Sequence, residues 1–356
     1  MTNASEAQVS ARPGTSAGTT PAASRETEGR TRSDPGRVLG AASRALRGRS
    51  AVTSGVLVFY VVLSTFFWLQ VPGFGSYNNA VNIISTASVV MIVSLGQALA
   101  IISGGFDLSV GGIVPLGAVV FAQLTNGGMS VPTALVGVLV VGTAVGGLNA
   151  LLIGPFGINP LIATLGTLSI TGGIAFTVAN GVTLQLRPEA GILGDPTVAQ
   201  LPYFAFLVVG LGVFIHLLLR YTVLGRRIYT VGGNSEAARL AGIRVGWVLF
   251  GVYGLSGALA SLAGVVAASQ VLAATGDIGA TTTLVSVAAV VLGGAALTGG
   301  TGGVPGTVLG VLLLATVANG MNIMRVPAFY QQIVTGAVLL FAVGFGRLQE
   351  TLRDRR

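Results

Sequence analysis

The sequence predicts an all-α polytopic membrane protein with about ten transmembrane helices. Of its 356 residues, 52% are hydrophobic and only 8% are charged, and the mean hydropathy is +0.82. Soluble domains carry about 25% charged residues, and disordered chains are hydrophilic, so both classes are excluded. The 54 glycines fit a membrane bundle, because small residues let membrane helices approach closely.

Residues 1–48 differ from the rest of the chain. They are rich in Ser, Thr, Ala, Gly, Pro and Arg and lack hydrophobic periodicity, which predicts a disordered cytoplasmic tail. A secretory signal is not expected, because the segment is too long and no clear small-residue cleavage site follows. The transmembrane domain is expected over residues 49–346 and a short cytoplasmic C-terminal tail over residues 347–356.

Glycine, proline, asparagine and charged clusters divide the apolar region into ten segments, most of them near the length of about 20 residues that crosses a bilayer. The eighth segment is short, and residues 284–324 could contain a helix broken around residues 299–303. Residues 104–109 resemble residues 293–298, which is either a trace of a duplicated helix-break-helix unit or chance in a Gly-rich chain. The expected helices lie at 51–70, 80–102, 108–125, 131–153, 160–180, 201–219, 247–268, 284–298, 304–324 and 328–346.

The basic residues, all of them arginines, set the expected topology. Eight lie in residues 1–50, five in residues 220–246 and four in residues 347–356, which leaves only Arg187 and Arg325. The positive-inside rule places these three groups on the cytoplasmic face, so both termini are expected there in a multi-pass protein of a bacterial cytoplasmic membrane, surrounded by lipid. Cytoplasmic loops therefore account for the net charge of +8, and no nucleic-acid partner is expected.

The spans contain almost no ionisable side chains. Ion-coupled carriers usually place such groups inside their spans, so the sequence favours a path for a neutral solute. With one His and no Cys, it indicates neither an enzyme nor a metal site. His216 is expected to reach the headgroups rather than to relay protons, and Asp107 is expected to cap the following helix rather than to take part in transport.

Uncharged amides and hydroxyls inside the spans could line a path for a hydroxyl-rich solute. Interhelical hydrogen bonding favours the same residue types, and the sequence alone does not separate these two interpretations. The residues taken as candidates for the path are Gln97, Asn149, Thr164, Asn319 and Asn322.

The polar segment at residues 225–245 predicts a short cytoplasmic helix of about two turns. Asn234 or Ser235 can cap its start, Glu236 and Arg239 match the helix dipole, and Gly242 can end it. A helix this short is stable only when it is docked. Its remaining side chains form a small face that can approach another protein: Ala237, Ala238, Leu240 and Ala241.

These residues carry a resemblance to a known family. Glu236-Ala237-Ala238 followed by Gly242 is similar to the EAA-xxx-G core of the coupling loop in bacterial ABC importer permeases. Residues 232–243 resemble the ribose/xylose-type monosaccharide branch, and residues 164–181 and 288–322 agree with it. A further stretch resembles the GG-I-DLSVG signature of that branch through Gly104, Gly105, Asp107, Leu108, Ser109 and Gly111. The resemblance covers about residues 78–346.

The resemblance implies the permease subunit of an ATP-driven sugar importer. Its partners would be an ATP-binding subunit docked on the coupling helix, an extracytoplasmic sugar-binding protein and a second permease copy, either identical or paralogous. A chain without Lys cannot contain a phosphate-binding loop, so ATP and Mg would be bound by the partner and no cofactor is expected here. Two alternatives stay open: the same architecture for a nucleoside or furanone-like signal, and a stand-alone secondary carrier or channel.

The sequence departs from the family pattern at four positions. The family commonly carries Glu and Asp where this chain has Thr283 and Val285, and Lys and Arg where it has Thr301 and Gly303. These missing charges weigh against a ribose-like specificity.

Overall fold

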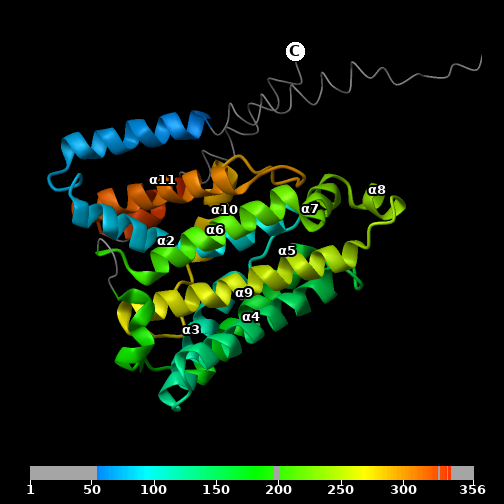
Figure 1. Cartoon of the computed structure of the whole chain (residues 1–356), viewed down its shortest axis with the longest axis horizontal. Helices are drawn as coiled ribbons and strands as arrows, with labels where there is room; N and C mark the ends of the chain where they lie inside the picture. Colours follow the sequence, from blue (N-terminus) through cyan, green and yellow to red (C-terminus); the bar gives the residue numbers. More distant parts are fainter. Residues whose placement is uncertain (1–53, 196–199, 328, 335, 338–356) are drawn as a thin grey trace, which may run out of the picture. The chain divides into compact units, whose positions relative to one another are not determined.

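The computed structural model describes residues 54–195, 200–327, 329–334 and 336–337. The described part is predominantly helical, as the composition predicts (Figure 1). After an apolar helix at Ser54–Gln70, the helices are α2 (Tyr77–Ile102), α3 (Val110–Asn126), α4 (Val131–Ile153), α5 (Pro160–Val178), η1 (Pro188–Gly194), α6 (Tyr203–Tyr221), α7 (Val223–Gly233), α8 (Ser235–Leu240), α9 (Val245–Val271), α10 (Thr282–Leu292) and α11 (Val304–Ile323).

Six of these helices are long and apolar enough to cross a membrane: α2, α4, α5, α6, α9 and α11. The helix at Ser54–Gln70, α3 and α10 are apolar but shorter. The expected tails, and most of the expected span at 328–346, lie outside the described residues. The total of about ten spans and the side on which the termini lie therefore stay predictions.

The structure differs from the expected helices in two places. The helix expected at 284–298 ends at Leu292, because Gly293 and Gly294 follow it, and the next helix starts only at Val304. The second change is an additional helix, α7, just before the short helix expected in the loop after α6. The sequence analysis missed α7 because its arginines and glycines resemble a polar loop, although Ile228 and Val231 lie on a buried face of the helix.

Local sequence signals explain several helix starts. The Ser76 hydroxyl accepts a hydrogen bond from the Asn79 amide at the start of α2, and Ser130 does the same for Thr133 at the start of α4. At the start of α5, the Asn159 side chain caps the helix and Pro160 occupies the first helical position, where its missing N–H is not needed.

α9 is the central helix and packs against α2, α3 and α4. At its crossing with α4, a Cβ atom on Gly142 or Gly257 would overlap the backbone of the facing helix. Inside a membrane such close backbone approach supplies the van der Waals contact that holds helices together. Glycines therefore allow close helix crossings in this bundle, as the glycine-rich composition predicts.

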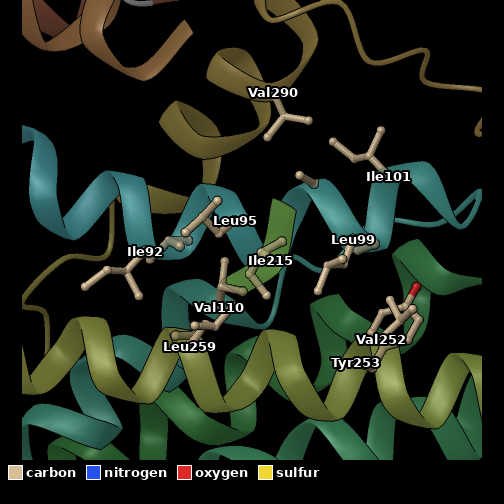
Figure 2. Close-up of a cluster of buried hydrophobic side chains, with 14 of the residues drawn as sticks. Ile92, Leu95, Leu99, Ile101, Val110, Ile215, Val252, Tyr253, Leu259 and Val290 are labelled. Atoms are coloured by element: carbon tan, nitrogen blue, oxygen red, sulfur yellow. The ribbon is translucent and has the colours of Figure 1, made fainter. Parts of the chain in front are cut away.

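The core of the bundle lies where α2 passes between α9 and α10. Figure 2 shows α2 with Leu95 and Leu99 in this layer, α9 with Leu259, and Val290 of α10 on the other side. Leu95, Leu99 and Val290 are fully buried. Side chains on the outside of the bundle, such as Ile162 of α5 at 68% exposure, are apolar as well, as expected for helices that face lipid.

The two ends of the bundle differ. At one end lie α7 and α8, whereas η1 lies at the other (Figure 1). Near η1, β1 (Leu184–Gln185) and β2 (Ala273–Ala274) form a two-stranded antiparallel sheet, with Leu184 opposite Ala274. η1 packs against the end of α9, where the Ser269 hydroxyl donates to the Ala190 carbonyl.

Candidate coupling helix and solute path

The short helix expected in the polar loop is present as α8. The Asn234 side chain accepts a hydrogen bond of 2.9 Å from the Ala237 amide and so caps its start. Asn234 also ends α7, which begins at the capping residue Thr222. Gly242 follows α8 with a φ of +80°, a left-handed conformation that glycine adopts at low cost.

α8 is anchored on one side and exposed on the other. Ala238 is fully buried, and its carbonyl accepts a hydrogen bond from the Ile243 amide. Leu240 is 85% exposed, although it is a large apolar residue. Glu236 and Arg239 form an ion pair of 3.3 Å on the exposed side. The helix therefore presents an apolar side chain and a charged pair to whatever lies beyond it.

Next to α8, the end of α7 is in direct backbone contact with two loops. The Gly300 amide, in the loop after α10, donates to the Ile102 carbonyl at the end of α2 over 2.9 Å. Gly232 of α7 lies so close to these two groups that a Cβ atom there would collide with the Ile102 carbonyl. We call Gly104, Gly232, Gly299 and Gly300 the glycine junction, because Gly299 in turn lies against both Gly232 and Gly104.

A side chain adds to this contact. The Tyr229 hydroxyl of α7 donates to the Gly302 carbonyl over 2.9 Å. α7 is therefore joined to the loop between α2 and α3 and to the loop between α10 and α11. These are the two glycine-rich breaks whose sequences resemble each other.

Asp107 lies in the first of these breaks and is fully buried. The prediction that it caps α3 is wrong: the capping position belongs to Ser109. The Asp107 carboxylate accepts from the Ser109 amide and hydroxyl through one oxygen and from the Ser256 hydroxyl of α9, at 2.6 Å, through the other. The carboxylate is turned toward α9, and it bonds only one amide near the start of α3.

The hydrogen bonds of Asp107 continue into two more helices. The Asn149 amide of α4 donates to the Ser109 hydroxyl over 2.8 Å, and the Thr167 hydroxyl of α5 donates to the Asn149 carbonyl oxygen over 2.8 Å. We call Asp107, Ser109, Asn149, Thr167 and Ser256 the Asp107 network; all five are buried. At Asn149 the structure thus shows interhelical hydrogen bonding, one of the two interpretations left open above.

The other residues taken as candidates for the path lie in different environments. Thr164 is buried and donates to the Pro160 carbonyl of its own helix. Asn319 of α11 donates to Asn79 of α2 over 2.9 Å, whereas Asn322 is exposed. Gln97 of α2 is fully buried, and neither of its amide atoms has a hydrogen-bond partner. The structure does not bring these residues together in one cluster.

The remaining signature positions are explained by close packing. Gly105 lies against the Tyr253 hydroxyl of α9, and Gly111 lies against the Thr283 hydroxyl of α10, with no room for a Cβ atom at either position. The sequence analysis noted Thr283 only as a departure from the family and did not single out Ser256. The sequence gives no sign of the contact between Gly111 and Thr283, because the two residues lie on different helices.

Within the described part of the chain, no group of three His, Cys, Asp or Glu side chains could hold a metal ion. His216 lies partly exposed near the end of α6, a turn before Arg220.

Comparison with known proteins finds permease components of transport systems. A family model described as "Branched-chain amino acid transport system / permease component" matches residues 79–343. The chain is 36% identical over 311 residues to the probable ABC transporter permease protein y4mJ of Sinorhizobium fredii, covering 87% of this chain and 92% of the relative.

Two relatives from Escherichia coli K12 are named for the sugars that they import. The ribose import permease protein RbsC is 34% identical over 295 residues, covering 81% of this chain and 90% of RbsC. The galactose/methyl galactoside import permease protein MglC is 34% identical over 331 residues, covering 86% of this chain and 98% of MglC. No solved structure matches the chain significantly.

Proposed function

The chain belongs to the family of branched-chain amino acid transport system permease components, and from that premise we propose that it forms the path of an ATP-driven importer for a neutral monosaccharide. It is a multi-pass protein of the cytoplasmic membrane and a transport component rather than an enzyme. A separate ATPase supplies the energy and acts on this chain through α8.

The observation that carries this proposal is the position of α8 beside the glycine junction. A helix of six residues is too short to be stable alone, and Leu240 is turned away from the bundle. A docked ATPase would cover that side chain. On the other side, Gly232 transmits a movement of α7 directly to the loops after α2 and after α10. The contact is between backbone atoms, so no flexible side chain absorbs the movement.

The interior favours a neutral solute. Helices α2–α5 and α9–α11 contain no Asp, Glu, Lys, Arg or His, and the buried Asp107 already accepts three hydrogen bonds. A branched-chain amino acid, which the family description names, is a zwitterion that would enter this interior without opposite charges to meet it. The relatives named for ribose and galactose import fit the neutral interior better.

The proposal includes three partners: the ATP-binding subunit, which holds ATP and Mg, an extracytoplasmic sugar-binding protein and a second permease copy. Arg220, Arg226, Arg227, Arg239 and Arg244 all belong to the loop and helices around α7 and α8. By the positive-inside rule this end is cytoplasmic, where an ATPase can reach it.

The test is uptake by the complete importer in proteoliposomes. Labelled ribose, arabinose and galactose are supplied with the binding protein, with leucine and a nucleoside as comparisons. We expect ATP-dependent uptake of a sugar and none of leucine. Uptake of the nucleoside instead would favour the alternative solute class, and uptake without ATP would contradict the importer.

A substitution on α8 tests the coupling. Leu240→Asp should abolish both co-purification of the ATPase and ATP-dependent uptake, because it removes the exposed apolar contact. Leu240→Met is the matched control and should retain both. Normal uptake by the Leu240→Asp variant would contradict docking through α8.

A further inference from the structure

Gln97 belongs to a small set of buried polar side chains that have no partner. Among the described residues, such atoms are found on Ser64, Ser94, Gln97, Thr283, Thr316 and Asn319. Gln97 is the extreme case, because it is 0% exposed and both ends of its amide are unpartnered. A buried donor or acceptor without a partner destabilises a fold, so native proteins retain few of them, and each requires an explanation.

Four of these residues lie on three helices that pack on one another. Ser94 and Gln97 are one turn apart on α2, where residues three apart are neighbours. Thr283 lies on α10 and Thr316 on α11; α10 packs against α2, α3 and α11, and α11 packs against α2. We call Ser94, Gln97, Thr283 and Thr316 the polar seam.

The four residues also lie within one range of depth along their helices. The end of α2 and the loop between α10 and α11 meet at the glycine junction, so distances along these helices can be counted from there. At a rise of about 1.5 Å per residue, Gln97 is about 8 Å and Thr316 about 18 Å from that end of its helix. Ser94 and Thr283 fall between them, so the polar seam extends from about 8 to about 18 Å into a core about 30 Å thick and includes its midpoint.

The chemistry of the polar seam matches one class of solute. A primary amide and three hydroxyls offer donors and acceptors without charge. Sugar hydroxyls also donate and accept, so they can bond groups of each of these kinds. An ion or a zwitterion would be buried among them without an opposite charge.

Resting on the importer function proposed above, we infer that Ser94, Gln97, Thr283 and Thr316 bind the hydroxyl groups of the transported solute at mid-membrane depth. The Asn149 amide has no such role, because both of its polar atoms are already bonded within the Asp107 network. α2 ends beside the glycine junction and the loop after α10 reaches it, so a movement of α7 would shift α2 relative to α10.

The chain contains no Cys, which allows a direct test of access. In the complete importer, Ser94→Cys and Thr283→Cys should react with a small hydrophilic thiol reagent during ATP turnover. The binding protein loaded with the transported sugar should slow the reaction at least fivefold. Ser88→Cys is the matched control, because Ser88 is equally buried on α2 but donates to the Ile84 carbonyl. Failure of both seam cysteines to react, or equal reaction at Ser88→Cys, would overturn the inference.

A second variant separates binding from folding. Gln97→Leu should lower uptake at least tenfold without lowering the melting temperature of the importer, since it removes an amide that the fold does not bond. Gln123→Leu should retain uptake, because Gln123 is an exposed amide near the end of α3. Unchanged uptake by Gln97→Leu, or a loss that follows a lower melting temperature, would contradict the inference alone. Absence of ATP-dependent sugar uptake in the unaltered importer would instead contradict the proposed function.

Discussion

The Asp107 network and the polar seam are both buried polar clusters, yet they are opposite in hydrogen bonding. In the Asp107 network, each of the five side chains bonds another member, and together they join the start of α3 to α4, α5 and α9. In the polar seam, no side-chain polar atom has a partner. Burial and residue type are similar in the two clusters, so the difference lies in whether the protein itself supplies the partners.

The difference indicates that the two clusters have different roles. Satisfied polar groups in an apolar interior fix the register of the helices that they join, because any sliding would leave several groups unpartnered. Unsatisfied groups weaken the fold unless a ligand or water meets them. The comparison therefore predicts that changes in the Asp107 network act on stability, whereas changes in the polar seam act on transport.

The largest effect is expected for Asp107→Ala. Three donors, the Ser109 amide and hydroxyl and the Ser256 hydroxyl, lose their acceptor, and each buried donor left alone costs about 1–3 kcal/mol. We expect the free energy of unfolding of the purified permease in detergent to fall by about 3–5 kcal/mol. Asp107→Asn keeps one acceptor oxygen and should lose about half as much. A change below about 1 kcal/mol for Asp107→Ala would break the comparison, since the network would then not be structural.

The next effect concerns the connection between the polar seam and α7. Gly232→Ala should lower the free energy of unfolding by about 1–3 kcal/mol, because the added methyl group overlaps the Ile102 carbonyl. The fraction that folds should also lose ATP-dependent uptake. Gly233→Ala is a matched control, since a Cβ atom there meets nothing within 4 Å. Equal behaviour of the two variants in unfolding and uptake would contradict a tight junction.

The sequence was sufficient to predict most of the helical architecture. Length and apolarity placed α4 at residues 131–153, as the structure has it, and the capping residue Asn234 located the short helix. These signals are local, because a helix start depends on side chains within one turn. The boundary of α10 was less predictable, since an apolar run continues past Gly293 while the backbone turns away.

The site residues could not be separated by the same means. Gln97 and Asn149 are both amides inside apolar helices, and only the partners of Asn149, on other helices, distinguish them. Asp107 was misassigned for a similar reason: Ser256 of α9, which donates to the second oxygen of the carboxylate, lies 149 residues later in the chain. Helical periodicity carries no information on such contacts.

A matched pair of threonine variants compares the two clusters directly. Thr167→Val removes the donor to the Asn149 oxygen and should lower the free energy of unfolding by about 1–2 kcal/mol, with uptake per folded molecule retained. Thr283→Val removes an unpartnered buried hydroxyl, so the free energy of unfolding should not fall and should rise by up to about 3 kcal/mol. Its uptake should fall several-fold. Unfolding titrations and uptake assays on both proteins give the answer, and a reversed pattern would remove the distinction.

The smallest effect is expected on α8, where the comparison extends to the surface. Glu236 and Arg239 are 71% and 57% exposed, and ion pairs in water contribute about 0–1 kcal/mol. A double-mutant cycle of Glu236→Ala and Arg239→Ala should therefore give a coupling energy in that range, which falls further as salt is added. A coupling energy above about 1 kcal/mol would mean that the pair holds α8 together. A coupling energy near zero would mean that the exposed side of α8, like the polar seam, does not stabilise the isolated chain. Glu236, Arg239 and Leu240 would then be available to bind the ATPase that the proposed importer function requires.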